Sequence, residues 1–153
     1  MVAEQTESSI LIDASARRVM DVIADLASYP QWSDGITEVT VLSESDGRPA
    51  TARFELASGP IKDTYELAYD WRGDDHVAWH LTRGDMLRAM DGSYDLSEQP
   101  SGQTEVRYRL VVDVKVPMIG MIKRKAEKVI VDTALRGLKA RVESTESTDP
   151  TGG

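Results

Sequence analysis

Most of the chain between residues 37 and 114 alternates apolar and polar positions with a period of two. This pattern is typical of β-strands that bury one face and expose the other. The clearest runs are 65–71 and 106–114, and turn signals such as Gly73-Asp74-Asp75 separate the runs. We predict strands over residues 8–12, 37–43, 51–57, 65–71, 77–81, 86–96 and 106–114.

A helix is predicted after the first strand. Asp13 or Ser15 offers a side-chain oxygen for its N-cap, and apolar residues follow at helical spacing up to Leu26. The helix should end before Pro30, because the residue before a proline avoids the helical region. We interpret residues 29–35 as a turn that could contain a short second helix.

A second, much longer helix is predicted over residues 118–142, after Pro117 has ended the last strand. Its apolar positions recur every three or four residues, which is the period of an α-helix. The predicted buried stripe consists of Ile122, Ala126, Ile130, Ala134, Leu138 and Val142.

The order of these elements predicts an α+β fold. Consecutive strands joined by short turns give an antiparallel sheet, and the helices are segregated from the strands along the chain. We predict a curved antiparallel sheet of about seven strands wrapped around the long C-terminal helix. One domain is expected over residues 8–143, between a flexible N-terminus (1–7) and a disordered tail (144–153).

The charge of the chain narrows the partners that it can have. The 153 residues carry a net charge of −8, so a phosphate backbone should repel the protein and no nucleic-acid partner is expected. The chain contains no cysteine, which excludes disulfides, thiolate metal sites and a cysteine nucleophile.

Positive charge is concentrated near the C-terminal end. Residues 115–141 contain eight basic and two acidic residues, a net +6, so the rest of the chain carries −14. We interpret the basic residues as a solvated helix face. The alternative is a transient contact with an anionic membrane through Lys123, Arg124, Lys125 and Lys128.

No apolar run approaches the roughly 18–20 residues that a membrane-spanning helix needs. Residues 1–9 are polar and acidic and lack the basic-then-apolar layout of a signal peptide. We therefore expect a soluble, cytoplasmic protein.

Two segments resemble a known family. Residues 12–32 (IDASARRVMDVIADLASYPQW) and residues 116–127 (VPMIGMIKRKAE) resemble the START-like superfamily, in particular its polyketide cyclase/dehydrase and coenzyme-Q-binding branch and its small actinobacterial members. The resemblance covers about residues 8–143. It implies a helix-grip fold with an apolar cavity between sheet and helix, in which members bind lipids, isoprenoid quinones, polyketides or hormones, and only some members are enzymes.

The candidate ligand-binding residues are mostly aromatic side chains on the apolar faces of the predicted strands. Each ring alone fits a filled core, but together they favour a pocket, because inward tyrosine hydroxyls need polar partners. Methionines at the start of the long helix have flexible side chains that could line the entrance to a ligand cavity, although ordinary core filling is the favoured interpretation. The predicted site is Trp32, Phe54, Asp63, Tyr65, Tyr69, Trp79, Arg88, Met90, Tyr94, Tyr108, Met118, Met121 and Ile122.

Arg88 is the sharpest single candidate. The strand parity set by Met86 and Met90 places it on the apolar face, where an unpaired charge would be costly. By the same parity Asp63 faces inward, so Arg88 could pair with Asp63 or with a ligand carbonyl or carboxylate. The alternative, weighed equally, is a bulge or strand end that turns Arg88 outward.

Metal binding is not expected. His76 and His80 are four residues apart on a predicted strand, which separates them by roughly 13 Å, too far to share an ion. They also fall on the face opposite Val77 and Trp79. No cofactor is expected, and the sequence contains none of the common phosphate-binding or catalytic motifs.

The leading prediction is a binding protein that holds a hydrophobic small molecule (a lipid, an isoprenoid quinone or a polyketide-like molecule) in an internal cavity. The alternative is a polyketide aromatase/cyclase or dehydratase in which polar pocket residues do the chemistry. Whether the protein is an enzyme stays open, with binding favoured. A chaperone or protein-interaction role is the least favoured, because it would require an exposed apolar patch.

Overall fold

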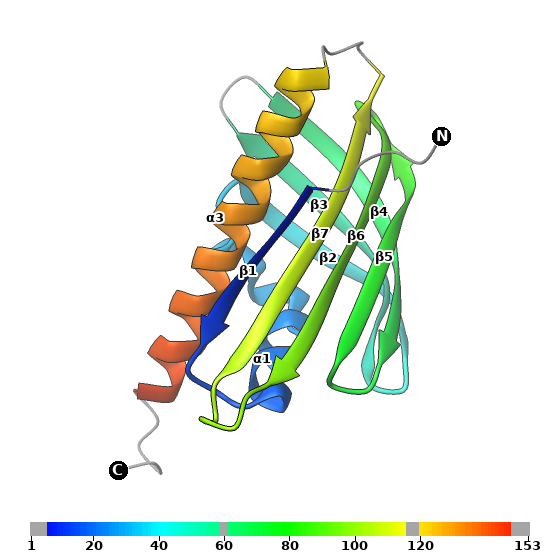
Figure 1. Ribbon diagram of the computed structural model, residues 1–153. Helices are drawn as coiled ribbons and strands as arrows, with labels where there is room; N and C mark the ends of the chain where they lie inside the picture. The colour runs from blue at the N-terminus through cyan, green and yellow to red at the C-terminus, as the bar shows by residue number, and fades with distance from the viewer. Residues whose placement is uncertain (1–5, 59–60, 116–119, 148–153) are drawn as a thin grey trace.

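The architecture is a curved, seven-stranded antiparallel sheet with one long helix across its concave side (Figure 1). The structure is a computed structural model that describes residues 6–58, 61–115 and 120–147. The predicted α+β class and the antiparallel sheet wrapped around a C-terminal helix are confirmed.

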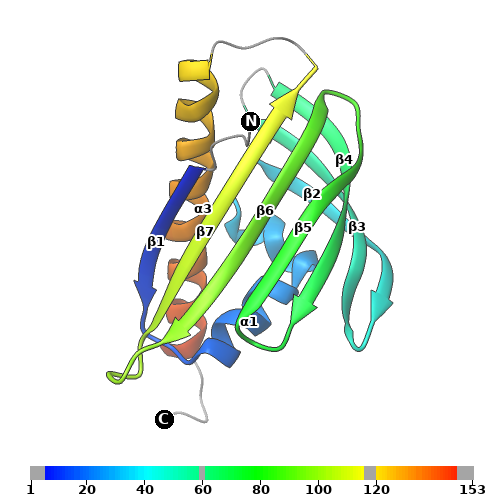
Figure 2. The same ribbon diagram turned by 45° about the vertical axis from the view of Figure 1, so that its right-hand side comes forward.

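The strands follow one another as hairpins, except that the first strand pairs with the last. The spatial order is β1-β7-β6-β5-β4-β3-β2, and every neighbouring pair is antiparallel (Figure 2). β1 and β2 are therefore the two edge strands. The bounds are β1 Thr6–Ile12, β2 Ile36–Ser45, β3 Arg48–Ser58, β4 Ile61–Arg72, β5 His76–Gly84, β6 Leu87–Glu98 and β7 Thr104–Val114.

Three short helical elements connect β1 to β2: α1 (Ala16–Ala24), the 3₁₀ turn η1 (Leu26–Ser28) and α2 (Tyr29–Trp32). Ser15 is the N-cap of α1, because its hydroxyl accepts a hydrogen bond from the backbone N–H of Arg18 at 3.2 Å. Pro30 lies in the first turn of α2, where its missing N–H has no helical partner to lose.

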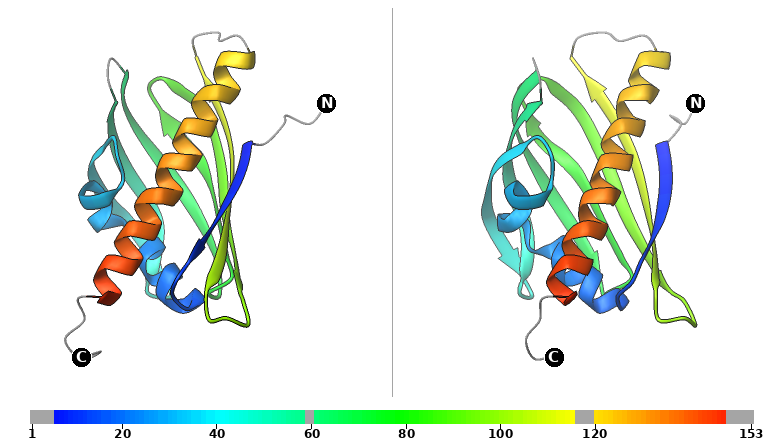
Figure 3. Two further views of the ribbon diagram at one scale, coloured as in Figure 1. Left: turned by 60° about the vertical axis from the view of Figure 1, so that its left-hand side comes forward. Right: turned by 90° about the vertical axis from the view of Figure 1, so that its left-hand side faces the viewer.

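The long helix α3 (Gly120–Ser147) packs on β1 and β7, and also against α1 and α2 (Figure 3). Its buried stripe includes Val131, Leu135, Leu138 and Val142. The predicted stripe was wrong at Ile130, which is 41% exposed. Both sets of residues recur at helical spacing, so periodicity could not choose between them, and contact with β1 and β7 decides which face is buried.

The predicted boundaries shift at both ends of the domain. β1 begins at Thr6, so residues 6–7 are strand where a flexible N-terminus was predicted. α3 extends to Ser147, so residues 144–147 are helical where a tail was predicted. The core lies between the concave face of the sheet, α1 and α3, and its most enclosed side chains include Ile12, Val19 and Leu138.

Irregular pairing occurs in two strands that matter below. In β6 the register with β7 shifts between Leu87 and Ala89, which marks a β-bulge at Arg88. In the edge strand β2 the register with β3 shifts at three places between Ile36 and Glu44.

Candidate functional site

Aromatic side chains from five adjacent strands gather on the concave side of the sheet. The rings of Tyr94 and Tyr108 are 4.6 Å apart, and the ring of Trp79 lies 5.3 Å from the first and 5.6 Å from the second. We call this surface the aromatic face. It consists of Phe54 on β3, Tyr65 and Tyr69 on β4, Trp79 on β5, Tyr94 on β6 and Tyr108 on β7.

The centre of the aromatic face depends on a glycine. Gly92 lies opposite Trp79 in the β5–β6 ladder, and a Cβ atom at position 92 would come within 2.3 Å of the indole ring. The indole therefore lies against the backbone of β6 at Gly92, where its ring is close to those of Tyr94 and Tyr108. The sequence predicted Trp79 as a site residue but carried no sign of what Gly92 does.

Four hydroxyl groups of the aromatic face have no hydrogen-bond partner among the residues that the structure describes, and their oxygen atoms are not fully enclosed by protein: those of Tyr65, Tyr69, Tyr94 and Tyr108. Three of these residues are nearly buried, with exposed fractions of 5% for Tyr65 and Tyr94 and 7% for Tyr108. The rings are enclosed while the hydroxyl oxygens keep contact with open space, so these groups favour a water molecule or a ligand beside them.

The hydroxyls also lie close enough to influence one another. Burial raises the pKa of Tyr69 well above its usual value, and the phenols of Tyr65, Tyr94 and Tyr108 raise it further. Burial likewise raises the pKa of Tyr94, and neighbouring Tyr108 adds to the shift. All four phenols therefore stay protonated near neutral pH and can act as hydrogen-bond donors.

Tyr29 is an aromatic neighbour that the sequence analysis did not select. Its ring lies 6.3 Å from that of Phe54, but its hydroxyl donates a hydrogen bond to the carbonyl oxygen of Ile23 at 2.5 Å. Its position in a predicted turn hid this role, since turn residues carry no strand parity. Tyr29 therefore differs from the four unpartnered tyrosines and offers a matched control.

Trp32, a predicted site residue, lies in α2 beside the aromatic face and borders two surface hollows. One hollow has a volume of about 330 Å³ and continues to Ile36 and Ala57, and the other has about 190 Å³. The indole Nε1 of Trp32 is buried without a partner among the described residues. α3 approaches Trp32 closely at Gly137, where a Cβ would lie 2.8 Å from the Trp32 carbonyl oxygen.

The remaining apolar candidates are only partly placed. Met90 is half-buried and lies opposite Val112, on the concave side of β6. Met118 lies outside the described residues. Met121 and Ile122 belong to α3, but their side chains are not among those that the structure describes.

Asp63 faces inward as predicted, but its partner was predicted wrongly. Its carboxylate accepts hydrogen bonds from the backbone N–H groups of Asp85 and Met86 at 3.1 Å and of Leu87 at 3.0 Å. The side chain is 6% exposed. The carboxylate of Asp63 therefore anchors the turn between β5 and β6. The predicted role, a contact with an arginine or a ligand, is not what it does.

Arg88 points outward, so of the two orientations weighed equally from the sequence the structure shows the second, in which a bulge turns the side chain away from the apolar face. The bulge at this position inserts one extra residue, so that Leu87 and Met90 both face inward while Arg88 does not. Its side chain is 62% exposed and lies 3.7 Å from Asp113. The predicted pair with Asp63 is absent from the described structure.

A buried carboxylate that the sequence analysis missed lies on α3. Glu127 is 2% exposed and accepts hydrogen bonds from the hydroxyl of Thr6 at 2.8 Å and from the backbone N–H of Val112 at 2.7 Å. The available signal was its position four residues before Val131, in line with the buried stripe. Glu127 thus joins α3 to β1 and to β7.

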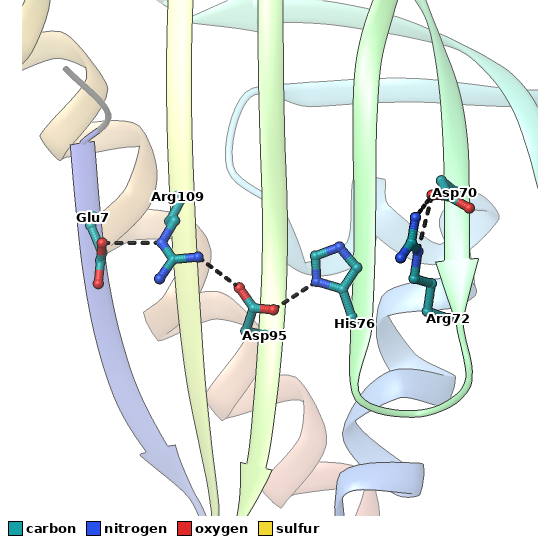
Figure 4. Close-up of polar contacts among 6 residues, drawn as sticks. All are labelled: Glu7, Asp70, Arg72, His76, Asp95 and Arg109. Carbon is teal, nitrogen blue, oxygen red and sulfur yellow. Dashed lines mark hydrogen bonds and ion pairs between the residues drawn. The ribbon is translucent and has the colours of Figure 1, made fainter. Parts of the chain in front are cut away.

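The two histidines lie on the convex side of the sheet, opposite the aromatic face. His76 contacts Asp95 at 2.6 Å, Asp95 pairs with Arg109 at 3.2 Å, and Arg109 pairs with Glu7 at 3.1 Å (Figure 4). His80 is exposed. In the described part of the chain, no group of three or more potential ligands could hold a metal ion.

Positive charge is scarce beside the aromatic rings. In the described structure, one cationic side chain lies over an aromatic ring: the guanidinium carbon of Arg48 is 5.4 Å from the ring centre of Trp71. Its guanidinium already donates hydrogen bonds to the carbonyl oxygen of Gly73 and to Asp74. Arg48 is therefore committed to the β4–β5 turn.

Of the predicted basic patch, Lys125 and Lys128 are exposed, and Lys128 contacts Asp132 at 3.0 Å and Ser8 at 3.3 Å. The side chains of Lys123 and Arg124 are not described. Within the described ranges, none of the helices has the length and apolarity to cross a bilayer.

Comparison with solved structures shows the same fold in distant proteins. The chain is similar to a START superfamily protein from Mycobacterium smegmatis, with 21% identity, a TM-score of 0.86 and coverage of 93% of this chain and 99% of the other. It is also similar to an aromatase/cyclase, Zhui, from Streptomyces sp. R1128, with 14% identity, a TM-score of 0.80 and coverage of 96% and 98%.

A protein from Thermus thermophilus is similar at 18% identity, with a TM-score of 0.80 and coverage of 93% and 99%. A search of curated proteins found no match. The model of the family described as "Polyketide cyclase / dehydrase and lipid transport" matches residues 12–139. This match spans most of the chain, and the protein therefore belongs to the polyketide cyclase/dehydrase and lipid transport family, with a START-like fold.

Proposed function

We propose that the protein binds a hydrophobic small molecule against the aromatic face, in the space between the sheet and α3. The observation that carries this proposal is the set of four tyrosine hydroxyls that have no hydrogen bond within the described chain, although three of their rings are nearly buried and the fourth, Tyr69, is half-buried. A face built only to fill the core would pair such hydroxyls or replace them with phenylalanine. An apolar wall with a few convergent polar groups is the usual composition of a ligand site.

The family and its relatives support binding as the general activity, because both lipid transport and aromatic cyclisation require an apolar ligand inside this fold. The groups of the site also suit binding better than proton transfer. Asp63 and Glu127 are the buried carboxylates of the described chain, and each already accepts hydrogen bonds from the backbone. Neither is available as a general base in this arrangement.

The test is whether the purified protein carries or accepts an apolar ligand. Native mass spectrometry shows any molecule that copurifies, and titration with N-phenyl-1-naphthylamine, a neutral fluorescent probe, measures affinity. Trp79→Leu should weaken probe binding at least severalfold, because it removes the ring at the centre of the face.

Leu11→Ala is the matched control, since Leu11 is an apolar side chain that is 45% exposed on the edge strand β1. It should leave probe affinity unchanged. A protein that carries no ligand and does not bind the probe, or that loses as much affinity in Leu11→Ala as in Trp79→Leu, would contradict the proposal.

A second candidate is a polyketide aromatase/cyclase. It is favoured by the similarity to Zhui from Streptomyces sp. R1128 and by the tyrosine donors, which could stabilise a developing enolate oxygen. Turnover of a poly-β-keto mimic, lost when Tyr94 and Tyr108 are replaced by phenylalanine, would establish this function. Binding of the mimic without turnover would favour the first candidate, a ligand-binding protein.

A further inference from the structure

Resting on the proposed function, we infer that the side chain of Trp32 is a gate, and that the ligand reaches the aromatic face when this indole swings out into the surface hollow beside α2. Trp32 borders both surface hollows, so its ring forms part of the outer wall of the molecule there. The inference names the route of the ligand and is independent of the ligand's identity.

The indole of Trp32 lies between the larger hollow and the aromatic face. It borders the hollow of about 330 Å³ that continues to Ile36 and Ala57. Its ring centre is also 4.7 Å from that of Tyr29, and the ring of Tyr29 is 6.3 Å from that of Phe54, a member of the aromatic face. Displacing the indole therefore opens a path from the hollow, along Tyr29, to the aromatic face.

Within the described chain, no hydrogen bond holds this indole in place. Its Nε1 is buried and has no partner there, whereas Nε1 of Trp71 donates a hydrogen bond to the carbonyl oxygen of Pro49 at 2.6 Å. A buried donor without an acceptor raises the free energy of the conformation that buries it. When the ring of Trp32 swings into the hollow, its N–H meets water and this cost disappears. The open conformation can therefore be populated as a minor state.

The hollow has room for the displaced ring. Its volume of about 330 Å³ equals that of roughly ten water molecules in the liquid. An indole ring is smaller than this, so the ring of Trp32 can turn into the hollow and displace only water.

The backbone of Trp32 is held by its neighbours, while its side chain is not. Position 137 on α3 is a glycine, and a Cβ there would lie 2.8 Å from the carbonyl oxygen of Trp32 and 3.3 Å from Cε3 of its ring. The backbone N–H of Ser33 donates to the carbonyl oxygen of Tyr29 at 2.7 Å, which closes the single turn of α2. Opening is therefore a rotation about the side-chain bonds of Trp32, and Gly137 leaves space beside the ring for it.

An exposed apolar side chain of α3 lies along the same route. Ile130, Ala134 and Gly137 follow one another at helical spacing, so they share the face of α3 that meets Trp32. Ala134 is half-buried, but Ile130 is 41% exposed. Ile130 thus offers an apolar surface to a ligand that enters between α2 and α3.

The test of a gate is the rate of ligand exchange. A gate that is closed in both the free and the bound protein changes the association and dissociation rate constants by the same factor and leaves their ratio unchanged. Stopped-flow fluorescence measures both rate constants for N-phenyl-1-naphthylamine, and a titration measures its Kd.

Two changes at position 32 should act in opposite directions. Trp32→Ala should raise both rate constants at least about fivefold and keep Kd within about twofold. The second variant carries 3-benzothienylalanine in place of Trp32, which keeps the shape of the side chain but has sulfur in place of the N–H. Because the unpaired donor is gone, the closed position is stabilised, and both rate constants should fall about fivefold. This variant preserves the packing of α2, so it also tests the gate if Trp32→Ala loosens the fold.

Two variants are matched controls. Trp71→Ala removes an indole of the same size whose Nε1 is already bonded to Pro49. Tyr29→Phe alters the ring beside Trp32, keeps its size and removes a hydroxyl that is bonded to Ile23. Both variants should keep the native rate constants within about twofold.

Each other outcome has a distinct meaning. Native rate constants in Trp32→Ala, a Kd that changes along with only one rate constant, or equal acceleration in Trp71→Ala or Tyr29→Phe would overturn this inference while leaving the proposed binding function intact. Unchanged or faster exchange with 3-benzothienylalanine would also overturn it, because the unpaired N–H would then not weaken the closed position. A native protein that does not bind the probe would contradict the proposed function, and this inference with it.

Discussion

The indole of Trp79 occupies the space that a side chain on Gly92 would need, and this pairing across β5 and β6 sets the middle of the aromatic face. Gly92→Ala would place a Cβ within 2.3 Å of the ring and force the indole to move. We expect a loss of about 1–3 kcal/mol of unfolding free energy, as for overpacked cores. Urea denaturation followed by tryptophan fluorescence measures this loss.

A double-mutant cycle checks the cause. If the clash with the indole is responsible, combining Gly92→Ala with Trp79→Leu should cost clearly less than the sum of the two single changes. Simple additivity would show that Gly92 acts through the backbone of β6 and not through Trp79.

Asp63 should be one of the most sensitive polar positions. Asp63→Ala leaves the backbone N–H groups of Asp85, Met86 and Leu87 without their acceptor, which should cost about 2–4 kcal/mol of unfolding free energy. Asp85→Ala alters an exposed side chain in the same turn and should cost at most about 0.5 kcal/mol. Similar losses in the two variants, measured by chemical denaturation, would refute the anchoring role.

Two substitutions of Glu127 distinguish the stability that its hydrogen bonds contribute from the free-energy cost of burying its charge. Glu127→Ala should lose about 2–4 kcal/mol of unfolding free energy, because the N–H of Val112 and the hydroxyl of Thr6 lose their acceptor.

In Glu127→Gln the amide oxygen can accept from Val112 while the amide N–H donates to Thr6. We therefore expect this variant to stay within about 1 kcal/mol of the native protein, or to exceed it, since the buried charge is gone. Chemical denaturation of both variants checks this, and a glutamine variant as unstable as the alanine variant would mean that the charge itself is required.

The pH dependence of stability should have an identifiable contribution from Glu143. The side chain of Lys139 donates to its carboxylate at 2.6 Å and the backbone N–H of Asp13 donates at 3.0 Å, and these contacts lower the pKa of Glu143. A carboxyl group with a lower pKa in the folded state stabilises the protein above its unfolded pKa. That contribution disappears as the pH falls through the folded pKa.

Glu143→Gln should therefore be less stable than the native chain at pH 7, and the difference should shrink as the pH is lowered from about 5 to 3. Thermal unfolding of both proteins across that range measures it. The partly exposed Lys139–Glu143 pair is screened by solvent, so the effect should also decrease at high salt. A difference that does not change with pH would exclude this carboxyl group as its source.

Arg88 should be dispensable for ligand binding, in contrast to the role suggested by strand parity. Its side chain is exposed on the convex side beside Asp113, where an ion pair contributes little. Arg88→Ala should keep native affinity for the naphthylamine probe and lose at most about 0.5 kcal/mol of stability. A marked loss of probe affinity would place Arg88 in the site after all.

The sheet and the inward side of its aromatic residues were predictable from sequence because strand alternation is a local property. Tyr65, Tyr69 and Trp79 belong to uninterrupted runs, and their parity holds in the structure. Parity could not decide between the two orientations of Arg88, because a bulge resets parity within one residue, and β6 carries no proline or other breaker at that point to signal it. Periodicity also could not tell which of two helical stripes on α3 would meet the sheet.

The hydrogen bonds of Asp63 and Glu127 could not be predicted from the sequence, for a different reason. Asp63 accepts from backbone groups that are 22 to 24 residues away, and Glu127 accepts from one backbone group 15 residues away and from the hydroxyl of Thr6, 121 residues away. Backbone donors have no signature in a sequence, because every residue except proline has one. Only the assembled sheet shows which of them would otherwise lack an acceptor.

The shifts of register in β2 have a consequence for how molecules of this protein meet each other. β2 is an edge of the sheet, and an edge strand of regular register is a template on which another copy can add its own strand. Between Ile36 and Glu44 the pairing of β2 with β3 shifts three times, and the exposed side chains there include Glu38 and Glu44. An incoming strand would meet broken hydrogen-bond spacing and repelling carboxylates, so this edge resists fibrillar association even though Leu42 lies exposed along it.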